Sequence, residues 1–487
     1  MQTVWAIALG AATFRLLLFL GLDLYADEAY YWMWSRRPAA GYFDHPPMVA
    51  WLIRAGTEVL PGELGVRILF LACGALAVVF AALIGRELSD DPRVPAVAAI
   101  LAATSPMLFL TGGLALPDAP VEAAYAAGTW LVARARGKGW IPAGVAVGLA
   151  LLSKYTAALL APTLLLLVLL DRDLRRELVT PWPWLGGAVA ILVFLPNLLW
   201  NASHGWITIV FQLRHGTGSG ASIRSFLEFL GGLVGGAGLV ALPLGVWRLL
   251  RGRDSFTIRV AAATLAPILV TFLSALRGPV EANWAALAYP ALCGAGAAGL
   301  VRLRPSWSQG LLAVTVGLGM IFAVGFGLEV RNPTLIPPDS EVVRRFRGWP
   351  EFGAKARVAA GLACRAVGDP AGCRPEDPFV YTGSYQQAAA LAYYAGWTRL
   401  GPAAERPSQL DLWNDQPRPG SAFLTMGNIP EEKQLFKGTG PGPTATAEVL
   451  VKHQVLHGVE VQAWTDWQGA LQRRVTDLGY LKDVYPR

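Results

Sequence analysis

The sequence predicts an α-helical polytopic membrane protein that carries a soluble α/β region at its C-terminal end. Of the 487 residues, 54% are hydrophobic and only 15% are charged, whereas soluble proteins average about 25% charged residues. The mean hydropathy is +0.42, and the apolar residues form long blocks separated by short basic clusters, which is typical of membrane helices. The 18 Trp residues suit the interfacial belts of such a protein.

Eleven apolar segments are candidate membrane spans, and they run near 3–21, 65–85, 94–111, 118–133, 140–153, 156–170, 183–200, 226–247, 257–276, 284–301 and 308–328. The fifth and sixth are short and nearly continuous, and their division falls at Lys154. The first lacks a basic n-region and a small-residue cleavage site, so we expect a retained helix and not a cleaved signal peptide.

Basic residues follow every even-numbered span, which predicts the orientation of the chain. They are Arg86 and Arg93, then Arg134, Arg136 and Lys138, then Arg172, Arg175 and Arg176, then Arg248, Arg251 and Arg253, then Arg302 and Arg304. Loops rich in Lys and Arg face the cytoplasm, so the N-terminus is expected there and everything after residue 330 outside. This placement also accounts for the net charge of +7, and no nucleic-acid partner is expected.

Residues 331–487 are more polar than the rest, contain Pro and Gly throughout, and hold no apolar run long enough to span a membrane. They are predicted to form an extracytoplasmic α/β domain, with a strand near 459–468. A disulfide between Cys364 and Cys373 is compatible with that location. Cys73 and Cys293 lie in apolar segments and are expected to be inert.

The first outer loop, residues 22–64, carries DEAYYWMWS at 27–35 and YFDHPPMVAWL at 42–52. Asp27 and Glu28 directly follow the exit of the first span. One interpretation is an interfacial charge pair with aromatic anchors. The other is a carboxylate at the mouth of a membrane cavity that serves as a general base.

The second outer loop is short and places Asp118 between two apolar spans, with Glu122 one turn further on. A carboxylate at the membrane is costly and usually faces a cavity or a partner. Asp118 is also compatible with a helix N-terminal role, whereas Glu122 lies too deep for capping.

Four outer or membrane-depth basic side chains, Arg15, Lys154, Arg214 and His215, are candidates for an anion site. Such cations can snorkel, pair with a carboxylate, or together bind a lipid-linked phosphate. The GAGAAG stretch at 294–299 formally matches a nucleotide-binding motif. It lies within a span and has no strand before it, so close helix packing is the better interpretation.

The acidic pair after the first helix, the YFDHPP element and the PDAP motif of the next outer loop together resemble one family. That family is the GT-C membrane glycosyltransferase family of the 39/83 type. It includes dolichyl-phosphate-mannose protein mannosyltransferases and bacterial aminoarabinose transferases of lipid A. The architecture resembles theirs over residues 1–330. The motifs are specific only across about 3–52, 105–125 and 150–157.

The resemblance implies a polyprenyl-phosphate sugar donor and an inverting transfer outside the cytoplasm. It implies a catalytic role for Asp27 as general base, with Glu28 and Asp118. It implies donor-phosphate binding by His45, which stands where aminoarabinose transferases have Lys, by Lys154 and, through a looser match, by Arg214. Arg15 is assigned to the same phosphate site from its place near the outer end of the first span. A divalent metal ion held by Asp44 and His215 is a further hypothesis.

The chain is therefore expected to be a hexosyl- or pentosyltransferase of the bacterial inner membrane, embedded in the lipid bilayer. Its acceptor would be lipid A, another envelope glycan, a lipid or a protein, and the sugar stays open. A non-catalytic transporter or flippase of lipid-linked sugars would also need membrane cations and carboxylates, although no pair of related halves is visible. A structural subunit of an envelope complex would not need both Asp27 and Asp118.

Overall fold

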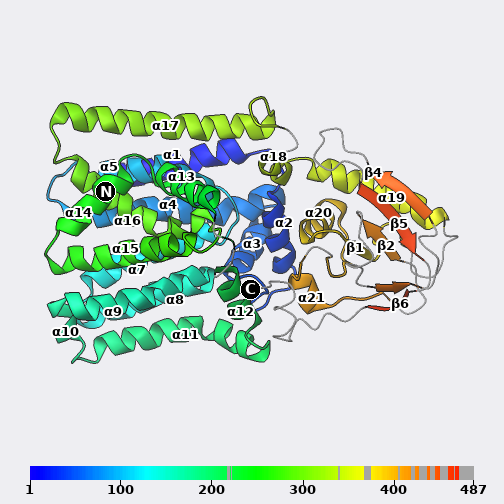
Figure 1. Ribbon diagram of the computed structural model, residues 1–487, viewed down its shortest axis with the longest axis horizontal. Helices are drawn as coiled ribbons and strands as arrows, with labels where there is room; N and C mark the ends of the chain where they lie inside the picture. Colours follow the sequence, from blue (N-terminus) through cyan, green and yellow to red (C-terminus); the bar gives the residue numbers. More distant parts are fainter. Residues whose placement is uncertain are drawn as a thin grey trace.

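The computed structural model describes residues 1–216, 220, 222–337, 340–366, 374–403, 406–417, 423–426, 436–438, 445–449, 459–464 and 467–470. The long helices of the first 331 residues lie side by side and nearly parallel in one bundle (Figure 1). The strands lie beyond one end of that bundle, and two short helices, α2 (Ala26–Ser35) and α3 (Met48–Val59), lie between the two parts.

Every predicted span contains helix. The corresponding helices are α1 (Gln2–Phe19), α4 (Gly62–Leu88), α5 (Val94–Thr104) with α6 (Pro106–Thr111), α7 (Asp118–Arg134), α8 (Trp140–Ser153), η2 (Tyr155–Leu159) with α9 (Leu160–Leu170), α11 (Trp182–Ser203), α13 (Ile223–Ala237) with α14 (Ala241–Arg251), α15 (Ser255–Ala275), η3 (Ala282–Ala288) with α16 (Tyr289–Leu300), and α17 (Pro305–Arg331). The division at Lys154 is confirmed, because α8 ends at Ser153 and α9 begins at Leu160.

The number of membrane spans stays a prediction. In the described part of the chain, five helices are long and apolar enough to cross a membrane, or six if α13 and α14, which meet at 83°, form one span. The other apolar helices are shorter. One reason is local chemistry: α5 ends where Ser105 precedes Pro106, and the residue before a proline disfavours helical backbone.

The GAGAAG stretch is a packing surface, as expected. A Cβ atom on Gly294 would lie 2.6 Å from the carbonyl oxygen of Ala81, and one on Gly296 would lie 2.9 Å from the Cα of Ala241. Both distances are too short for any side chain, so only glycine lets the backbones of α4 and α14 approach α16 this closely.

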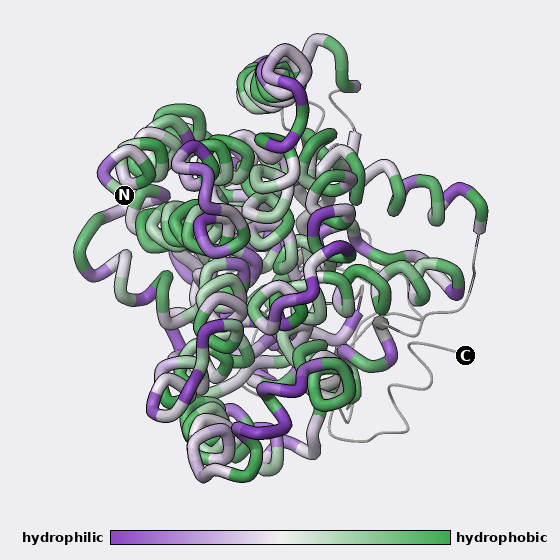
Figure 2. The backbone as a smooth tube through the Cα atoms, turned by 90° about the vertical axis from the view of Figure 1, so that its left-hand side faces the viewer, coloured by the Kyte–Doolittle hydropathy of each residue, from purple (hydrophilic) through white to green (hydrophobic). Residues whose placement is uncertain are grey.

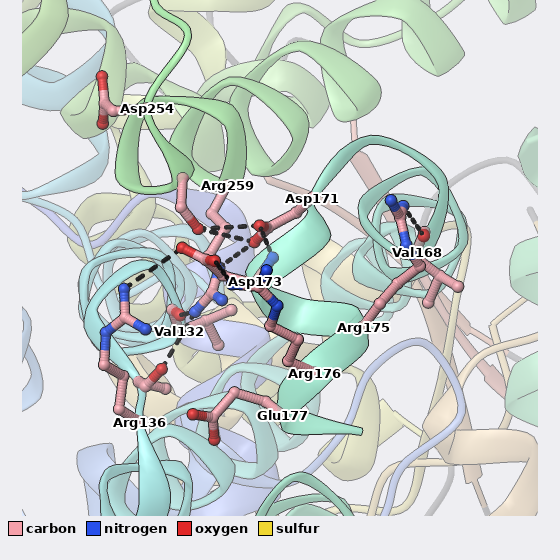
Figure 3. Close-up of polar contacts among 12 residues, drawn as sticks. Val132, Arg136, Val168, Asp171, Asp173, Arg175, Arg176, Glu177, Asp254 and Arg259 are labelled. Atoms are coloured by element: carbon pink, nitrogen blue, oxygen red, sulfur yellow. Dashed lines mark hydrogen bonds and ion pairs between the residues drawn. The ribbon is translucent and has the colours of Figure 1, made fainter. Parts of the chain in front are cut away.

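Basic side chains gather at the end of the bundle opposite the strands. There the buried Asp171 accepts a hydrogen bond from Arg259 of α15, which also donates to the carbonyls of Val132 and Ala135 (Figure 3). Arg136 and Arg176 lie beside it and pair with Asp173, which belongs to the short helix α10 (Arg172–Glu177). Hydrophilic segments cross this end, while many of the surrounding helices are hydrophobic (Figure 2).

The remaining elements follow α17 or connect the bundle helices. They are η1 (Gly137–Gly139), α12 (Ile207–Gly216), α18 (Glu341–Phe346), α19 (Trp349–Ala366), β1 (Val380–Thr382), α20 (Tyr385–Ala390), η4 (Leu391–Ala395), α21 (Gln409–Trp413), β2 (Phe423–Met426), β3 (Phe436–Gly438), β4 (Ala445–Val449), β5 (Val459–Trp464) and β6 (Trp467–Ala470).

The strands form a mixed sheet in the order β1-β2-β5-β4 and a separate β3-β6 pair. β1 runs parallel to β2, while β5 is antiparallel to both of its neighbours. The strand predicted near 459–468 is confirmed over 459–464, which is β5, whereas 467 and 468 begin β6 of the separate pair. Cys73 and Cys293 are free thiols. Cys364 is disulfide-bonded, and Cys373 lies outside the described residues.

One hydrophobic cluster joins the first outer loop to the region after residue 331. It contains Tyr30 and Trp34 of α2, Ile53 of α3, Phe352 of α19 and Leu391 of η4. The two regions therefore share a core, which fixes α2 between the bundle and the sheet (Figure 1).

Candidate functional site

Helix α2 begins at the exit of α1 and holds Asp27 and Glu28 in its first turn. Glu28 is fully buried, and all its contacts are structural. Its two oxygens accept hydrogen bonds from Arg67 Nε and Nη2 at 2.9 and 2.6 Å and from the backbone N–H groups of Tyr25 and Ala115, both at 2.8 Å. This geometry favours positioning over proton transfer for Glu28.

Asp27 lies on a more open side of the same turn, and its side chain is 19% exposed. Its Oδ1 accepts hydrogen bonds from the Tyr385 hydroxyl at 3.1 Å and from Gln386 Nε2 at 3.3 Å. Its Oδ2 lies 4.0 Å from Arg345 Nη1, beyond hydrogen-bond distance. Among the described residues, no hydrogen bond to Oδ2 is present, so this oxygen is available to accept a proton.

Asp44 is buried in the YFDHPP loop and makes an ion pair. Arg406 Nη1 lies 2.9 Å from its Oδ1, and the Tyr30 hydroxyl donates to its Oδ2 at 2.8 Å. Burial raises the pKa of Asp44, while Arg406 and Tyr30 act in the opposite direction. Side chains of α12 and α21 also hold the backbone of this loop. Gln212 donates to the Asp44 carbonyl oxygen, and Gln409 accepts from the Phe43 N–H.

These contacts do not fit the hypothesis of a metal ion at Asp44. Both carboxylate oxygens already have a donor, and the guanidinium of Arg406 places a positive charge where a metal cation would bind. Within the described residues, no group of three or more His, Cys, Asp or Glu side chains is arranged to hold a metal. The side chain of His215, the second predicted ligand, lies outside the described part.

Asp118 is the first residue of α7 and pairs with Lys154, as a carboxylate and a cation at this depth require. Lys154 Nζ lies 2.8 Å from Asp118 Oδ1, which also accepts from Asn283 Nδ2 at 3.0 Å. Both charged side chains are less than 10% exposed. An ammonium group has three donors, so Lys154 can hold Asp118 and still donate to a bound anion.

Two deeper residues make local contacts. Glu122 Oε2 accepts from the Thr111 hydroxyl at 2.9 Å. Arg15 donates to the carbonyls of Leu108 and Phe109 at 3.1 and 3.3 Å, at the end of α6. These bonds satisfy helix-terminal carbonyls, which favours a structural role for Arg15. Donor-phosphate binding by Arg15 stays a prediction.

The buried Tyr31 marks where the acidic residues converge. Burial raises its pKa well above the ordinary value, and the charges of Asp27, Asp44 and Asp118 act in the same direction. Its ring meets that of His45 edge-on with centroids 5.9 Å apart. Residues from both outer loops therefore act on one buried tyrosine.

Helix α12, which carries Arg214, packs against the YFDHPP loop. Thr208 and Gln212 of α12 donate to the carbonyls of Tyr42 and Asp44 at 2.7 and 2.6 Å. Arg214 follows on this helix and is half-buried. The structure thus brings α12 against the predicted phosphate-binding loop.

Sequence reasoning missed several residues of the site. Arg67 could have been found from the sequence, because an arginine within an apolar segment normally has a partner. Tyr385, Gln386 and Arg406 could not, since they lie in a polar region where Tyr, Gln and Arg are ordinary surface residues. Only the fold shows that they reach α2.

Several known proteins resemble this chain in sequence or in structure. The profile of the dolichyl-phosphate-mannose-protein mannosyltransferase family matches residues 44–200. The lipid A galacturonosyltransferase RgtD of Rhizobium johnstonii is 30% identical over 383 residues, which cover 74% of this chain and 78% of that protein. The chain belongs to the GT-C membrane glycosyltransferases of the protein mannosyltransferase and aminoarabinose transferase type.

Other members of this GT-C family are more distant or match a shorter segment. The undecaprenyl phosphate-α-4-amino-4-deoxy-L-arabinose arabinosyl transferase of Pseudomonas aeruginosa is 32% identical over 166 residues, which cover 32% of this chain and 30% of that protein. The crystal structure of ArnT from Cupriavidus metallidurans matches with a TM-score of 0.65 at 17% identity, over 94% of this chain and 97% of that one. A second structure of that protein, bound to undecaprenyl phosphate, gives a TM-score of 0.64 at 16% identity. The ArnT-like fold is therefore confirmed.

Proposed function

We propose that this GT-C enzyme transfers a sugar from a polyprenyl-phosphate donor to lipid A or the lipopolysaccharide core, with inversion, on the extracytoplasmic face. Two relatives, RgtD and a core galacturonosyltransferase of the same bacterium, are named for these acceptors. RgtD matches over most of both chains, whereas the aminoarabinose transferase matches over about a third. A galacturonosyl donor is therefore the first candidate, ahead of aminoarabinose.

The proposed mechanism rests on one property of Asp27, namely its carboxylate oxygen Oδ2. Asp27 is the one residue of the D-E pair whose carboxylate keeps an oxygen without a hydrogen bond among the described residues, and it is partly exposed. A general base must be able to reach its proton, and Glu28, with four protein donors, cannot do so without breaking its ion pair.

The proposed reaction is a single displacement at the anomeric carbon of the donor sugar. The acceptor hydroxyl oxygen attacks the anomeric carbon while its proton passes to Asp27 Oδ2. The bond from that carbon to the phosphate oxygen breaks, and the polyprenyl phosphate leaves with the electron pair. Because the attack comes from the face opposite the leaving group, the anomeric configuration inverts.

The leaving phosphate needs positive charge nearby, since its own charge increases as the bond breaks. Lys154 is the best placed cation, because Asp118, which Asn283 holds in turn, orients it through only one of its three donors. We assign His45 and Arg214 to the same task, because His45 lies in the loop that α12 holds and Arg214 lies on α12. Asp118 is then a positioning residue for Lys154.

The two ends of the bundle support the proposed orientation in the membrane. α2 lies at the end that meets the strands, whereas α10, which carries Arg175 and Arg176, lies at the other end (Figure 1). Arg136 lies beside α10 (Figure 3). Because basic loops face the cytoplasm, the site faces the opposite side, where lipid-linked sugars and lipid A meet.

An assay with purified enzyme in nanodiscs tests the proposal. Polyprenyl phosphates bearing labelled galacturonic acid, aminoarabinose or mannose are supplied with lipid A, and label transfer is measured. The wild type should transfer one of these sugars, and Asp27→Asn should lower kcat by about 10²- to 10⁴-fold while donor binding is kept. Glu58→Gln changes an exposed carboxylate of the same loop and should leave kcat unchanged.

Two outcomes would contradict the proposal. Full turnover by Asp27→Asn would exclude this residue as the base. Donor binding without any transfer by the wild type, together with donor movement across the bilayer, would instead favour a transporter of lipid-linked sugars.

A further inference from the structure

The region after residue 331 reaches into the site with specific side chains. Helix α20 packs on α2 within the shared hydrophobic cluster, and the ring of its first residue, Tyr385, contacts that of Tyr30 at a tilt of 55° with centroids 4.6 Å apart. Its hydroxyl and the amide of Gln386 are the two donors to Asp27 Oδ1. The carboxylate proposed as the base is therefore oriented from outside the membrane bundle.

We propose that Tyr385 and Gln386 are positioning residues, which hold Asp27 Oδ1 so that Oδ2 faces the acceptor hydroxyl. This inference rests on the proposed function, because it assigns a purpose to the base of that reaction. A free carboxylate rotates about its side-chain bonds, and fixing one oxygen with two donors removes that freedom before the substrate arrives.

Tyr385 is well suited to this task because it is itself fixed. The guanidinium carbon of Arg406 lies 4.2 Å from its ring centroid, and Arg406 in turn pairs with Asp44. Burial raises the pKa of Tyr385 far above its ordinary value, with a further contribution from the charge of Asp27. The hydroxyl therefore stays protonated near neutral pH and can donate to Asp27.

The pH dependence of kcat can reveal the hydrogen bond from the Tyr385 hydroxyl to Asp27. A hydrogen bond to a carboxylate favours its charged form, so removing the donor makes the base easier to protonate and moves the acidic limb of the pH–kcat profile to higher pH. Other ionisable groups that act on Asp27 stay unchanged in this variant. They are Arg345 from α18, Asp44 from the YFDHPP loop, and Tyr25 and Tyr31 beside and within α2.

The test compares two hydroxyl deletions in the same region. Tyr385→Phe removes the donor to Asp27, whereas Tyr394→Phe removes a hydroxyl that accepts from the backbone N–H of Leu24 at 2.7 Å. We expect Tyr385→Phe to lower kcat roughly 10- to 100-fold, as for the loss of a hydrogen bond to a charged group. The KM for the donor should stay close to wild type, and the acidic limb should move to higher pH. Tyr394→Phe should keep both kcat and the limb.

A second variant keeps the proposal testable if Tyr385→Phe fails to fold. Gln386→Glu is nearly isosteric and replaces a donor by a negative charge next to Asp27. It should lower kcat and move the acidic limb to higher pH still. The proposal is overturned if both folded variants match Tyr394→Phe in kcat and in pH profile. The proposed function fails separately, if Asp27→Asn retains turnover.

Discussion

Two adjacent carboxylates, Asp27 and Glu28, take different roles because successive residues of a helix point about 100° apart. Glu28 points inward, to the guanidinium of Arg67 and two backbone donors. Asp27 points toward α20 and keeps one oxygen without a hydrogen bond among the described residues. The acid pair is therefore one structural anchor and one candidate base, and the anchor sets the angle at which α2 leaves α1.

The anchor makes a prediction about stability. Glu28→Gln leaves Arg67 as a buried charge without its partner, and breaking a buried ion pair costs about 3–5 kcal/mol. We expect a marked fall in the free energy of unfolding, measured by chemical denaturation in detergent. Glu58→Gln breaks an exposed pair with Arg54, for which about 0–1 kcal/mol is typical. Equal stability of the two variants would contradict the assignment of Glu28 as an anchor.

At the scale of elements, close helix approach depends on small residues. Helix α16 is buried between α4 and α14, and its glycines meet backbone atoms of both neighbours. Membrane helices lack a hydrophobic force that drives them together, so tight contact through small residues supplies much of their attraction. The sequence therefore identifies α16 as a closely packed helix, although it does not identify the partner helices.

The variant Gly294→Ala tests the close contact between α16 and α4. The added methyl would lie 2.6 Å from the Ala81 carbonyl oxygen, and such overpacking costs about 1–3 kcal/mol. The melting temperature of the purified protein should fall. Gly317→Ala in α17 meets nothing within 4 Å and should keep or raise it, because alanine favours helix over glycine. A melting temperature unchanged by Gly294→Ala would show that α4 and α16 do not approach this closely.

At the scale of the whole molecule, the sequence predicts the helices well and their assembly poorly. Hydropathy placed helix in all eleven segments, and the break at Lys154 followed from the alternation of basic loops. The motifs of the outer loops predicted that Asp27, Asp44 and Asp118 belong to one site, because both loops connect spans on the same side. Tyr385 and Arg406 could not be placed, since their contacts with α2 depend on long-range packing of a region without a recognisable motif.

The orientation of the molecule is the last prediction, and two exposed valines test it. Val179 follows α10 at the basic end, and Val358 lies on α19 beside the strands; they are 88% and 64% exposed. Since basic loops stay in the cytoplasm, Val358→Cys should react with a membrane-impermeant maleimide in cells with a permeabilised outer membrane. Val179→Cys should react only after lysis, and the wild type gives the background from Cys73 and Cys293. The reverse pattern would place Asp27 on the cytoplasmic face, where the proposed transfer to the envelope cannot occur.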